Sequence, residues 1–230
     1  MWLLPSLGRP DGLRRLIDSY QWDGEEVKLI LHGWDNKLKQ YDDVQLPSNW
    51  EIGVTDEVHL SPTCAWALQR WPGAKCYGAL ADDITLETPG MLRRLEELAG
   101  DWYIAYLNDG AHCERLCTFP CSGAKLIHAT GDLSFGGLLH NGTDVVWYAL
   151  GIALRILQYA QNCKITHWHP AFGRGKWDET YALGQRGSLS SGKAYDKFMQ
   201  EGFEALRRRL SDTLDAAHVT RFPNAPMFVE

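Results

Sequence analysis

The sequence has no excess of positive charge, no long uninterrupted apolar run and no secretory pattern in its first residues. Its 230 residues include 23 Lys and Arg against 29 Asp and Glu, whereas proteins that bind nucleic acid through unspecific phosphate contacts are usually basic. The longest apolar stretch, 145–160, is interrupted by Arg155 and is shorter than the roughly 20 residues that span a bilayer. Met1–Ser6 has neither the basic segment nor the apolar core of a signal peptide. We therefore expect a cytoplasmic protein with no membrane partner and with its six cysteines reduced.

The composition has no internal repeat and no low-complexity segment. Hydrophobic residues make up 45% and charged residues 23%, which excludes a disordered chain. Ten Trp, nine Tyr and seven Phe suit either an aromatic core or a cleft for flat or sugar-like ligands. The charge is uneven, with thirteen basic and twenty-one acidic residues before Lys164, and ten basic and eight acidic from there on. This asymmetry favours a bound cation in the first part and an anionic partner for the second.

Short β-like runs alternate with helical patterns over the first two-thirds of the chain, which predicts an α/β fold with a mainly parallel sheet. The expected strands are 2–4, 27–31, 50–54, 76–80, 102–107 and 164–168. One helix is expected to begin at Asp11, and three more are expected at 61–70, 91–99 and 193–217. Residues 170–192, with five Gly and three Ser, predict a long flexible loop. We therefore divide the chain into a domain at 1–192, which includes this loop, and a C-terminal helix and tail at 193–230 that pack on it.

Polar side chains gather where the predicted strands end, and in an open α/β sheet ligands bind beyond those ends. These residues are Ser6, Arg9, Asp35, Asp56, Asp82, Asp83, Asn108 and Asp109. A carboxylate pair directly after a buried strand is unfavourable unless a cation or a helix N-terminus compensates it. Asp82 and Asp83 therefore either form part of a ligand site or begin a loop and cap the next helix.

The end of the last predicted strand carries a pair of histidines. His167 and His169 point to one side of an extended segment, and Trp168 points to the other. Two imidazoles on one face can bind a metal, although the same spacing is common without one. An aspartate pair and a histidine from two strand ends suit Mn²⁺ or Mg²⁺, with phosphate oxygens completing the shell.

Two further patterns are weaker. Three cysteines recur at a spacing of four, at Cys113, Cys117 and Cys121. With His112 or His128 they would make a zinc site, but ordinary buried thiols explain them better. Residues 172–176 superficially resemble a phosphate-binding loop. They lack the Walker spacing and the Ser or Thr after the Lys, and we exclude that site.

Several segments, taken in their order, resemble the motifs of nucleotide-sugar glycosyltransferases of the GT-A fold. The segments are Pro5–Pro10 at the first strand end, Ala81–Asp83 with Thr88–Gly90 as the acidic motif and its helix, and Gly142–Trp147 as the later acidic motif. His167–Pro170 and Gly175–Asp178 resemble the closing segment of a group similar to glycosyltransferase family 2 and common in phages and prophages. The likeness covers about residues 2–181, nearly four-fifths of the chain. The order of the motifs, more than any one of them, carries it.

The resemblance implies a GT-A, Rossmann-like sheet and a donor site that holds Mn²⁺ or Mg²⁺. The family's acidic motif reads Ala-Asp-Asp at 81–83 and lacks its first acid. Asp83 is therefore the implied direct metal ligand, and Asp82 the contact to the ribose or the donor sugar. His169 is implied as the second protein ligand of the metal, with His167 beside it.

The implied activity is metal-dependent transfer of a sugar, with inversion, from a nucleoside-diphosphate sugar, UDP-linked, to an acceptor hydroxyl. Only Thr143-Asp144 stands where many relatives carry two acids, so Asp144 is the implied base. Asp144 also suits a plain helix cap. The nucleotide-binding residues that the resemblance implies are Ser6, Arg9, Asp35, Asp82, Arg174 and Lys176. Arg174 and Lys176 would close with their loop over the diphosphate, although Lys176 also suits a solvated loop.

The resemblance extends to an acceptor in phage DNA, a 5-hydroxymethylpyrimidine. The last predicted helix carries Arg207–Arg209 near Lys193 and Lys197. These residues suit phosphate contacts or, equally, a solvated helix face. Two other functions remain open: a nucleotidyltransferase-like enzyme that uses the same carboxylates and metal, and a non-catalytic module that binds a nucleotide or glycan.

Overall fold

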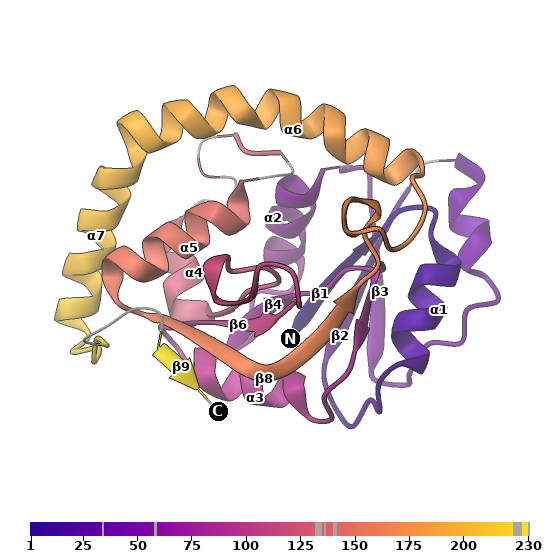
Figure 1. The fold of residues 1–230 in the computed structure, drawn as a ribbon, viewed down its shortest axis with the longest axis horizontal. Helices are drawn as coiled ribbons and strands as arrows, with labels where there is room; N and C mark the ends of the chain where they lie inside the picture. The colour runs from indigo at the N-terminus through magenta and orange to yellow at the C-terminus, as the bar shows by residue number, and fades with distance from the viewer. Residues whose placement is uncertain are drawn as a thin grey trace.

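The computed structural model describes residues 1–33, 35–57, 59–131, 135, 137–139, 142–222 and 227–229. For residues 35, 36, 189, 190 and 227–229 it describes the backbone only. Within these ranges the chain folds around one curled sheet with helices on both faces (Figure 1). None of the described helices is long and apolar enough to cross a membrane.

The sheet follows the order β3-β2-β1-β4-β7-β6-β8-β5, with β9 added beside β8. Its described strands are β1 (Trp2–Ser6), β2 (Val27–His32), β3 (Trp50–Thr55), β4 (Cys76–Ala79), β5 (Ile84–Leu86), β6 (Ile104–Asn108), β7 (Cys121–Gly123), β8 (Leu157–His167) and β9 (Met227–Val229). Five of the eight pairings are parallel, and the three antiparallel ones involve β5 or β7. The prediction of a mainly parallel α/β sheet is therefore confirmed. The sequence missed β5 and β7 because three residues are too few to show a period.

Helices cover both faces of the sheet because the buried strands are apolar on both sides. In β1, Trp2 and Leu4 face one hydrophobic cluster, whereas Leu3 faces the other. The first cluster lies under α1 (Pro10–Asp18) and α3 (Met91–Ala99). The second lies under α2 (Leu60–Arg70), α4 (Ala124–Thr130), α5 (Thr143–Leu154) and α7 (Phe203–Ala216). Short helical turns, at Asp35–Tyr41, Cys113–Arg115 and Pro170–Phe172, complete the connections.

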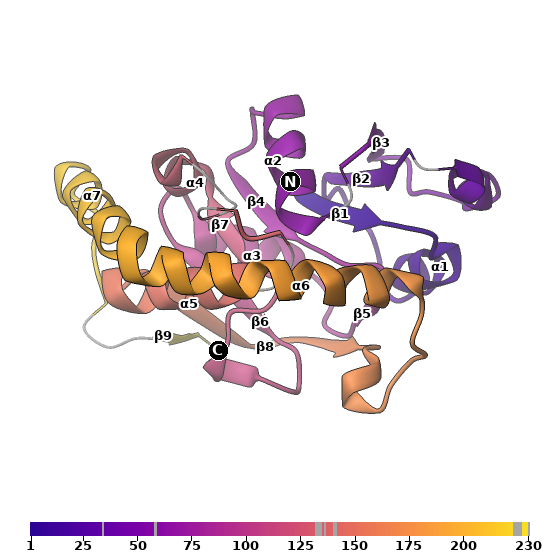
Figure 2. The ribbon, with the colours of Figure 1, turned by 90° about the horizontal axis from the view of Figure 1, so that it is seen from above.

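The expected loop at 170–192 is wrong for most of its length, because helix α6 covers Glu179–Lys197. Figure 1 shows α6 along the top of the molecule, and Figure 2, seen from above, shows it crossing in front of α5 and the sheet. The buried positions of α6 do recur at helical spacing, but small residues occupy them. Gly184, Gly187 and Ser191 are buried at spacings of three and four. Glycines weaken an isolated helix, which is why the sequence indicated a loop.

The C-terminal extension is continuous with α6. A π-helical segment, Phe198–Gly202, joins α6 to α7, and Figure 1 shows the chain bending there to run down one end of the molecule. The helix expected at 193–217 is thus the end of a much longer helical segment. The strand expected at 164–168 is likewise only the last part of β8.

Candidate functional site

A cavity of about 390 Å³ opens at the carboxyl ends of β1 and β4, and residues in the first turns of α6 form part of its wall. Seven of the residues singled out in the sequence line it: Ser6, Arg9, Asp82, Asp83, Asp144, His167 and His169. They come from four separate stretches of the chain. The topology thus brings the aspartate pair, the histidine pair and the Asp144 carboxylate to one cavity. A Cβ at Gly12 would lie 2.3 Å from the Asp82 carbonyl oxygen, so the glycine lets α1 lie close against this turn.

Asp82 is held by polar groups from the end of β1. The Ser6 hydroxyl donates to Asp82 Oδ2 at 2.7 Å, and Arg9 Nη1 donates to Asp82 Oδ1 at 3.3 Å. Ser6 Oγ also lies 2.7 Å from the Tyr41 hydroxyl. Burial raises the pKa of Asp82, and this outweighs the lowering by Arg9. Both carboxylate oxygens of Asp82 are therefore engaged within the chain.

Asp83 has one engaged oxygen and one free oxygen. Its Oδ2 accepts from the Tyr181 hydroxyl at 2.8 Å and lies 3.4 Å from His167 Nε2. Its Oδ1 is buried with no hydrogen-bond partner. Burial raises the pKa of Asp83, but His167, the Tyr181 hydroxyl and Arg9 lower it further, so the net shift is downward. Asp83 is thus an ionised carboxylate with a buried oxygen that still needs a partner.

Two residues at the start of α6 belong to the site, although the sequence analysis gave neither a role and named Asp178 only as the end of the closing segment. The Asp178 carboxylate accepts hydrogen bonds from Arg9 Nε and Arg9 Nη2, both at 2.7 Å. Its Oδ1 also caps α6 by accepting a hydrogen bond from Tyr181 N at 3.0 Å. The Tyr181 ring lies under the Arg9 guanidinium, 3.8 Å away. The pattern Asp178-Glu179-Thr180 before a helix is an N-cap signal. The glycines of the following segment concealed it.

The two histidines differ in what they can offer. His169 Nδ1 accepts from Ala171 N at 3.1 Å, and burial together with His167 lowers the pKa of His169. A neutral imidazole whose Nδ1 accepts carries its proton on Nε2, so His169 has no free lone pair in this arrangement. His167 packs between Phe119 and His169, and its Nδ1 is buried without a partner.

Asp144 lies in the first turn of α5 and lines the cavity. Its Oδ1 accepts from Val145 N at 2.9 Å. Burial raises the pKa of Asp144, and nearby backbone N–H groups only partly offset this. A partly buried carboxylate of raised pKa is a better proton acceptor, once ionised, than an exposed one.

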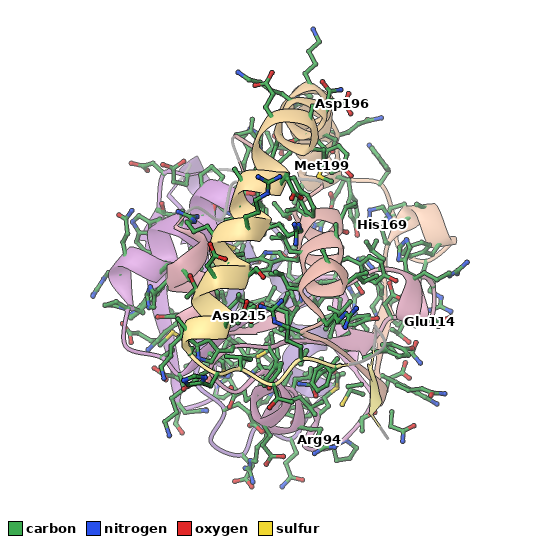
Figure 3. All side chains as sticks on the ribbon, turned by 90° about the vertical axis from the view of Figure 1, so that its left-hand side faces the viewer. Arg94, Glu114, His169, Asp196, Met199 and Asp215 are labelled. Atoms are coloured by element: carbon green, nitrogen blue, oxygen red, sulfur yellow. The ribbon has the colours of Figure 1, made fainter. Side chains whose placement is uncertain are left out.

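Other residues from the sequence analysis lie outside the cavity. Arg174 and Lys176 are exposed in the segment before α6 and do not line it. Asp35 begins a short helical turn, and its side chain lies outside the described residues. The arginines of α7 are engaged elsewhere: Arg207 and Arg208 pair with Glu204, and Arg209 donates to the Thr130 carbonyl. In Figure 3 Asp215, on α7, lies well away from His169.

No three His, Cys, Asp or Glu side chains in the described chain are placed to hold a metal ion by themselves. The spaced cysteines, of which Cys117 and Cys121 are buried, are free thiols here. A Mg²⁺-type site nevertheless needs only one or two carboxylates, because substrate phosphates and water supply the other ligands. The unpartnered Asp83 Oδ1 fits that requirement. The residues present thus fit a cation shared with a phosphate ligand and do not fit a closed protein cage.

No protein-family model matches the chain, and no curated protein is detectably similar in sequence. Among solved structures, the mannosyltransferase PcManGT from Pyrobaculum calidifontis, in complex with GDP-Man and Mn²⁺, matches at a TM-score of 0.52 and 10% identity. That match covers 96% of this chain and 76% of the mannosyltransferase. The likeness establishes the fold, and the GT-A type α/β architecture expected from the sequence is confirmed.

S. aureus TarS also matches, at a TM-score of 0.47 and 10% identity, and its fragment 1–349 in complex with UDP at 0.46 and 8%. Each match covers 64% of this chain. The chain spans 32% of the longer TarS chain and 52% of the fragment.

Proposed function

We propose that the protein transfers a sugar from a nucleoside-diphosphate sugar to an acceptor hydroxyl. The observation that carries the proposal is that the Asp82–Asp83 pair at one strand end and Asp144 on α5 line the same cavity. Donor chemistry needs a place for the diphosphate, and acceptor chemistry needs a base on the opposite side of the sugar. In the proposal the Asp82–Asp83 pair takes the donor side and Asp144 the acceptor side, and the likeness to a mannosyltransferase fold supports the same reading.

Asp83 holds the cation side of the donor site through Oδ1, the oxygen that has no partner within the chain. A bound Mn²⁺ or Mg²⁺ would neutralise the charge that develops on the leaving nucleoside diphosphate. His167 Nε2 lies 3.4 Å from the other Asp83 oxygen, Oδ2, and His169 joins the set only by releasing its bond from Ala171 N. Asp83 is therefore the principal metal ligand in the proposal.

The nucleoside part of the donor lies along the end of β1. Ser6 and Arg9 already hold Asp82 there, so the three side chains form a polar edge for ribose and phosphate. Asp35 is proposed as a contact to the base. Arg174 and Lys176 lie in the exposed segment just before α6 and would reach the diphosphate by movement of that segment.

Asp144 takes the proton from the acceptor hydroxyl. As the acceptor oxygen forms its bond to the anomeric carbon, the bond from that carbon to the diphosphate oxygen breaks, and attack from the opposite face inverts the centre. The nucleoside diphosphate leaves with the bonding electrons. Hydroxymethylated DNA is the acceptor proposed from the sequence resemblance, and sugar transfer to it would be detected as a mass increase of the modified base.

Binding of nucleoside diphosphates tests the donor site directly. We expect one of UDP, GDP, CDP and dTDP, UDP first, to raise the thermal midpoint only when Mn²⁺ or Mg²⁺ is present. At a hundredfold excess over Kd the stabilisation is about 2.7 kcal/mol. Asp83→Asn should abolish the metal-dependent part.

Asp56→Asn is the matched control, because Asp56 also follows a strand but is exposed and does not line the cavity. It should retain the full shift. If no diphosphate shifts the midpoint with either metal, the proposed donor site is wrong. Release of pyrophosphate in place of nucleoside diphosphate would instead identify a nucleotidyltransferase.

A further inference from the structure

The cavity has a second end that the donor site does not use. Away from Asp83 it continues between α2, α4, α5 and α6, where apolar side chains line it: Leu68, Tyr77, Ile127, Trp147 and Leu183. The Tyr77 hydroxyl is turned away to donate to the Trp71 carbonyl at 2.8 Å, which leaves the ring as the surface that lines the cavity. Aromatic and aliphatic walls of this kind favour a flat, weakly polar group.

Charge is scarce in this cavity. Among its described lining residues, Arg9 is the only Lys or Arg, and its guanidinium is committed to Asp82 and Asp178. No lysine or arginine therefore lines the apolar end to pair with an anionic acceptor group. Asp144 is the carboxylate that lines the α5 side, and it would repel such a group. An acceptor that reaches Asp144 is thus uncharged where it lies in the cavity.

Two hydroxyls in the cavity wall lack partners. Ser61 Oγ, on α2, and Thr118 Oγ1, in the segment before β7, are both buried without a hydrogen bond. Ser61 is 3% exposed. Buried hydroxyls normally find a partner, so a pair left without one in the wall of a cavity points to a ligand that supplies it. The next residue, Phe119, has a φ of 49° and also lines the cavity, which places backbone strain at the same spot.

The number of free polar groups limits the acceptor. A sugar ring presents several hydroxyls besides the one that reacts, and each needs a partner once it leaves water. Beyond the base, the unpartnered buried side-chain groups in this part of the described cavity wall are Ser61 Oγ and Thr118 Oγ1. The side chains of Thr63, Ser122 and Thr143 also line the cavity, but most of its wall is apolar, which suits an aromatic or heteroaromatic alcohol better than a sugar.

We propose that the acceptor of this chain is an uncharged alcohol carried on a single flat ring. The inference rests on the proposed function, because it assigns the acceptor side of that site. Asp144 and Trp147 are three residues apart on α5, and residues at this spacing share a helix face. The ring lies against Trp147 and Ile127, its polar edge meets Ser61 and Thr118, and its hydroxyl reaches Asp144.

Binding of small alcohols by saturation-transfer NMR tests the class without any sugar donor. The probes are benzyl alcohol, 5-hydroxymethyl-2′-deoxyuridine as the free nucleoside, and methyl β-glucoside. We expect the two ring alcohols to bind at least tenfold more tightly than methyl β-glucoside. A preference for the glucoside, or no binding of either ring alcohol, overturns the proposal.

Variants assign the binding to this end of the cavity. Ser61→Ala and Thr118→Val remove hydroxyls that have no partner in the chain, so the midpoint of unfolding should stay the same while affinity for the nucleoside falls severalfold. Trp147→Leu should weaken both ring alcohols about tenfold. The matched control is Ile152→Leu, at a residue of the same helix that is 37% exposed and does not line the cavity. Unchanged affinity in all three cavity variants overturns the assignment.

A third binding experiment distinguishes whether the ring belongs to DNA or to a free small molecule. A short single-stranded oligonucleotide with one 5-hydroxymethyluracil binds more tightly than the nucleoside if the ring belongs to DNA, and less tightly if a free small molecule is the acceptor. Both results support the flat-ring class. Nucleoside-diphosphate binding with Mn²⁺, measured on the same samples, separates the two proposals. Its failure counts against the donor site, whereas preference for the glucoside counts against the acceptor class alone.

Discussion

Asp109 is buried to 1% exposure in the turn after β6, and its carboxylate organises that turn. Asp109 Oδ1 accepts from the backbone N–H groups of Ala111, His112 and Cys113 at 2.8–3.1 Å, and Oδ2 lies 2.8 Å from His112 Nδ1. Asn keeps the shape but loses the negative charge. We expect Asp109→Asn to lower the free energy of unfolding by about 2 kcal/mol at pH 7, because hydrogen bonds to a charged group are the stronger kind.

The pH dependence of that difference identifies the charge as its cause. Burial raises the pKa of Asp109, but bonds from His112 and the backbone N–H groups lower it further, so the net shift is downward. A carboxylate whose folded pKa is depressed stabilises the protein fully above its unfolded pKa of about 3.9 and loses that stabilisation as pH falls through the folded pKa. Urea unfolding should therefore show a constant gap between wild type and Asp109→Asn from pH 7 to 5, and a smaller gap at pH 3.

Asp101→Asn is the control for the comparison between wild type and Asp109→Asn. The Asp101 carboxylate is half exposed and pairs with Lys125 on the surface, so its loss should change stability by less than about 1 kcal/mol. A gap for Asp109→Asn that is as large at pH 3 as at pH 7 would show that shape, not charge, holds the turn.

At the scale of elements, the sequence predicted the parts whose side-chain period matched their environment. β2 is buried at all six positions and apolar at four of them, and α3 buries its apolar side, so both were placed almost to the residue. The error over 170–192 has one physical cause. α6 presents glycine and serine at its buried positions, and small side chains at those positions leave no hydrophobic pattern to detect.

The candidate site divides in the same way. Its strand-end residues could be predicted because strand ends in an open sheet converge whatever the loops do. Asp178 and Tyr181 could not, because their contacts with Arg9 and Asp83 depend on where α6 crosses the sheet. The fold sets that placement through long-range packing, and no local pattern reports it.

Asp178 anchors the start of α6, so a substitution at this residue tests how the helix is held in place. Asp178→Ala removes the N-cap bond to Tyr181 N and both bonds from Arg9. A cap contributes about 1 kcal/mol, and the ion pair, whose acidic side chain is 40% exposed, adds less than a buried pair would. We expect a loss of about 1–2 kcal/mol and faster amide hydrogen exchange over the first two turns of α6.

Glu179→Gln provides the comparison, since Glu179 is at the next position but pairs only with Lys37 at the surface. It should leave both stability and exchange close to wild type. Equal protection of the first turns in Asp178→Ala and wild type would mean that another contact anchors α6. The bond from Thr180 Oγ1 to the Leu7 carbonyl would then be the next one to remove.

At the scale of the whole molecule, the C-terminal extension decides whether the chain unfolds as one unit. α7 buries Leu206, Leu210 and Leu214 and packs against α4 and α5. α6 crosses the boundary proposed at residue 192 without a break. Because the second hydrophobic cluster includes both the α7 leucines and core residues of β6 and β8, we expect domain and extension to unfold together.

Leu210→Ala measures that coupling. Leu210 is 1% exposed, so the truncation should lower the free energy of unfolding by about 3 kcal/mol through lost burial and the cavity it leaves. If the extension shares one core with the sheet, far-ultraviolet circular dichroism and tryptophan fluorescence shift to the same lower midpoint. An early circular-dichroism transition, with fluorescence at the wild-type midpoint, would instead make 193–230 a separately melting appendage. The control is Arg208→Ala, at a side chain 72% exposed on the same helix. It should change the free energy of unfolding obtained from either signal by no more than about 0.5 kcal/mol.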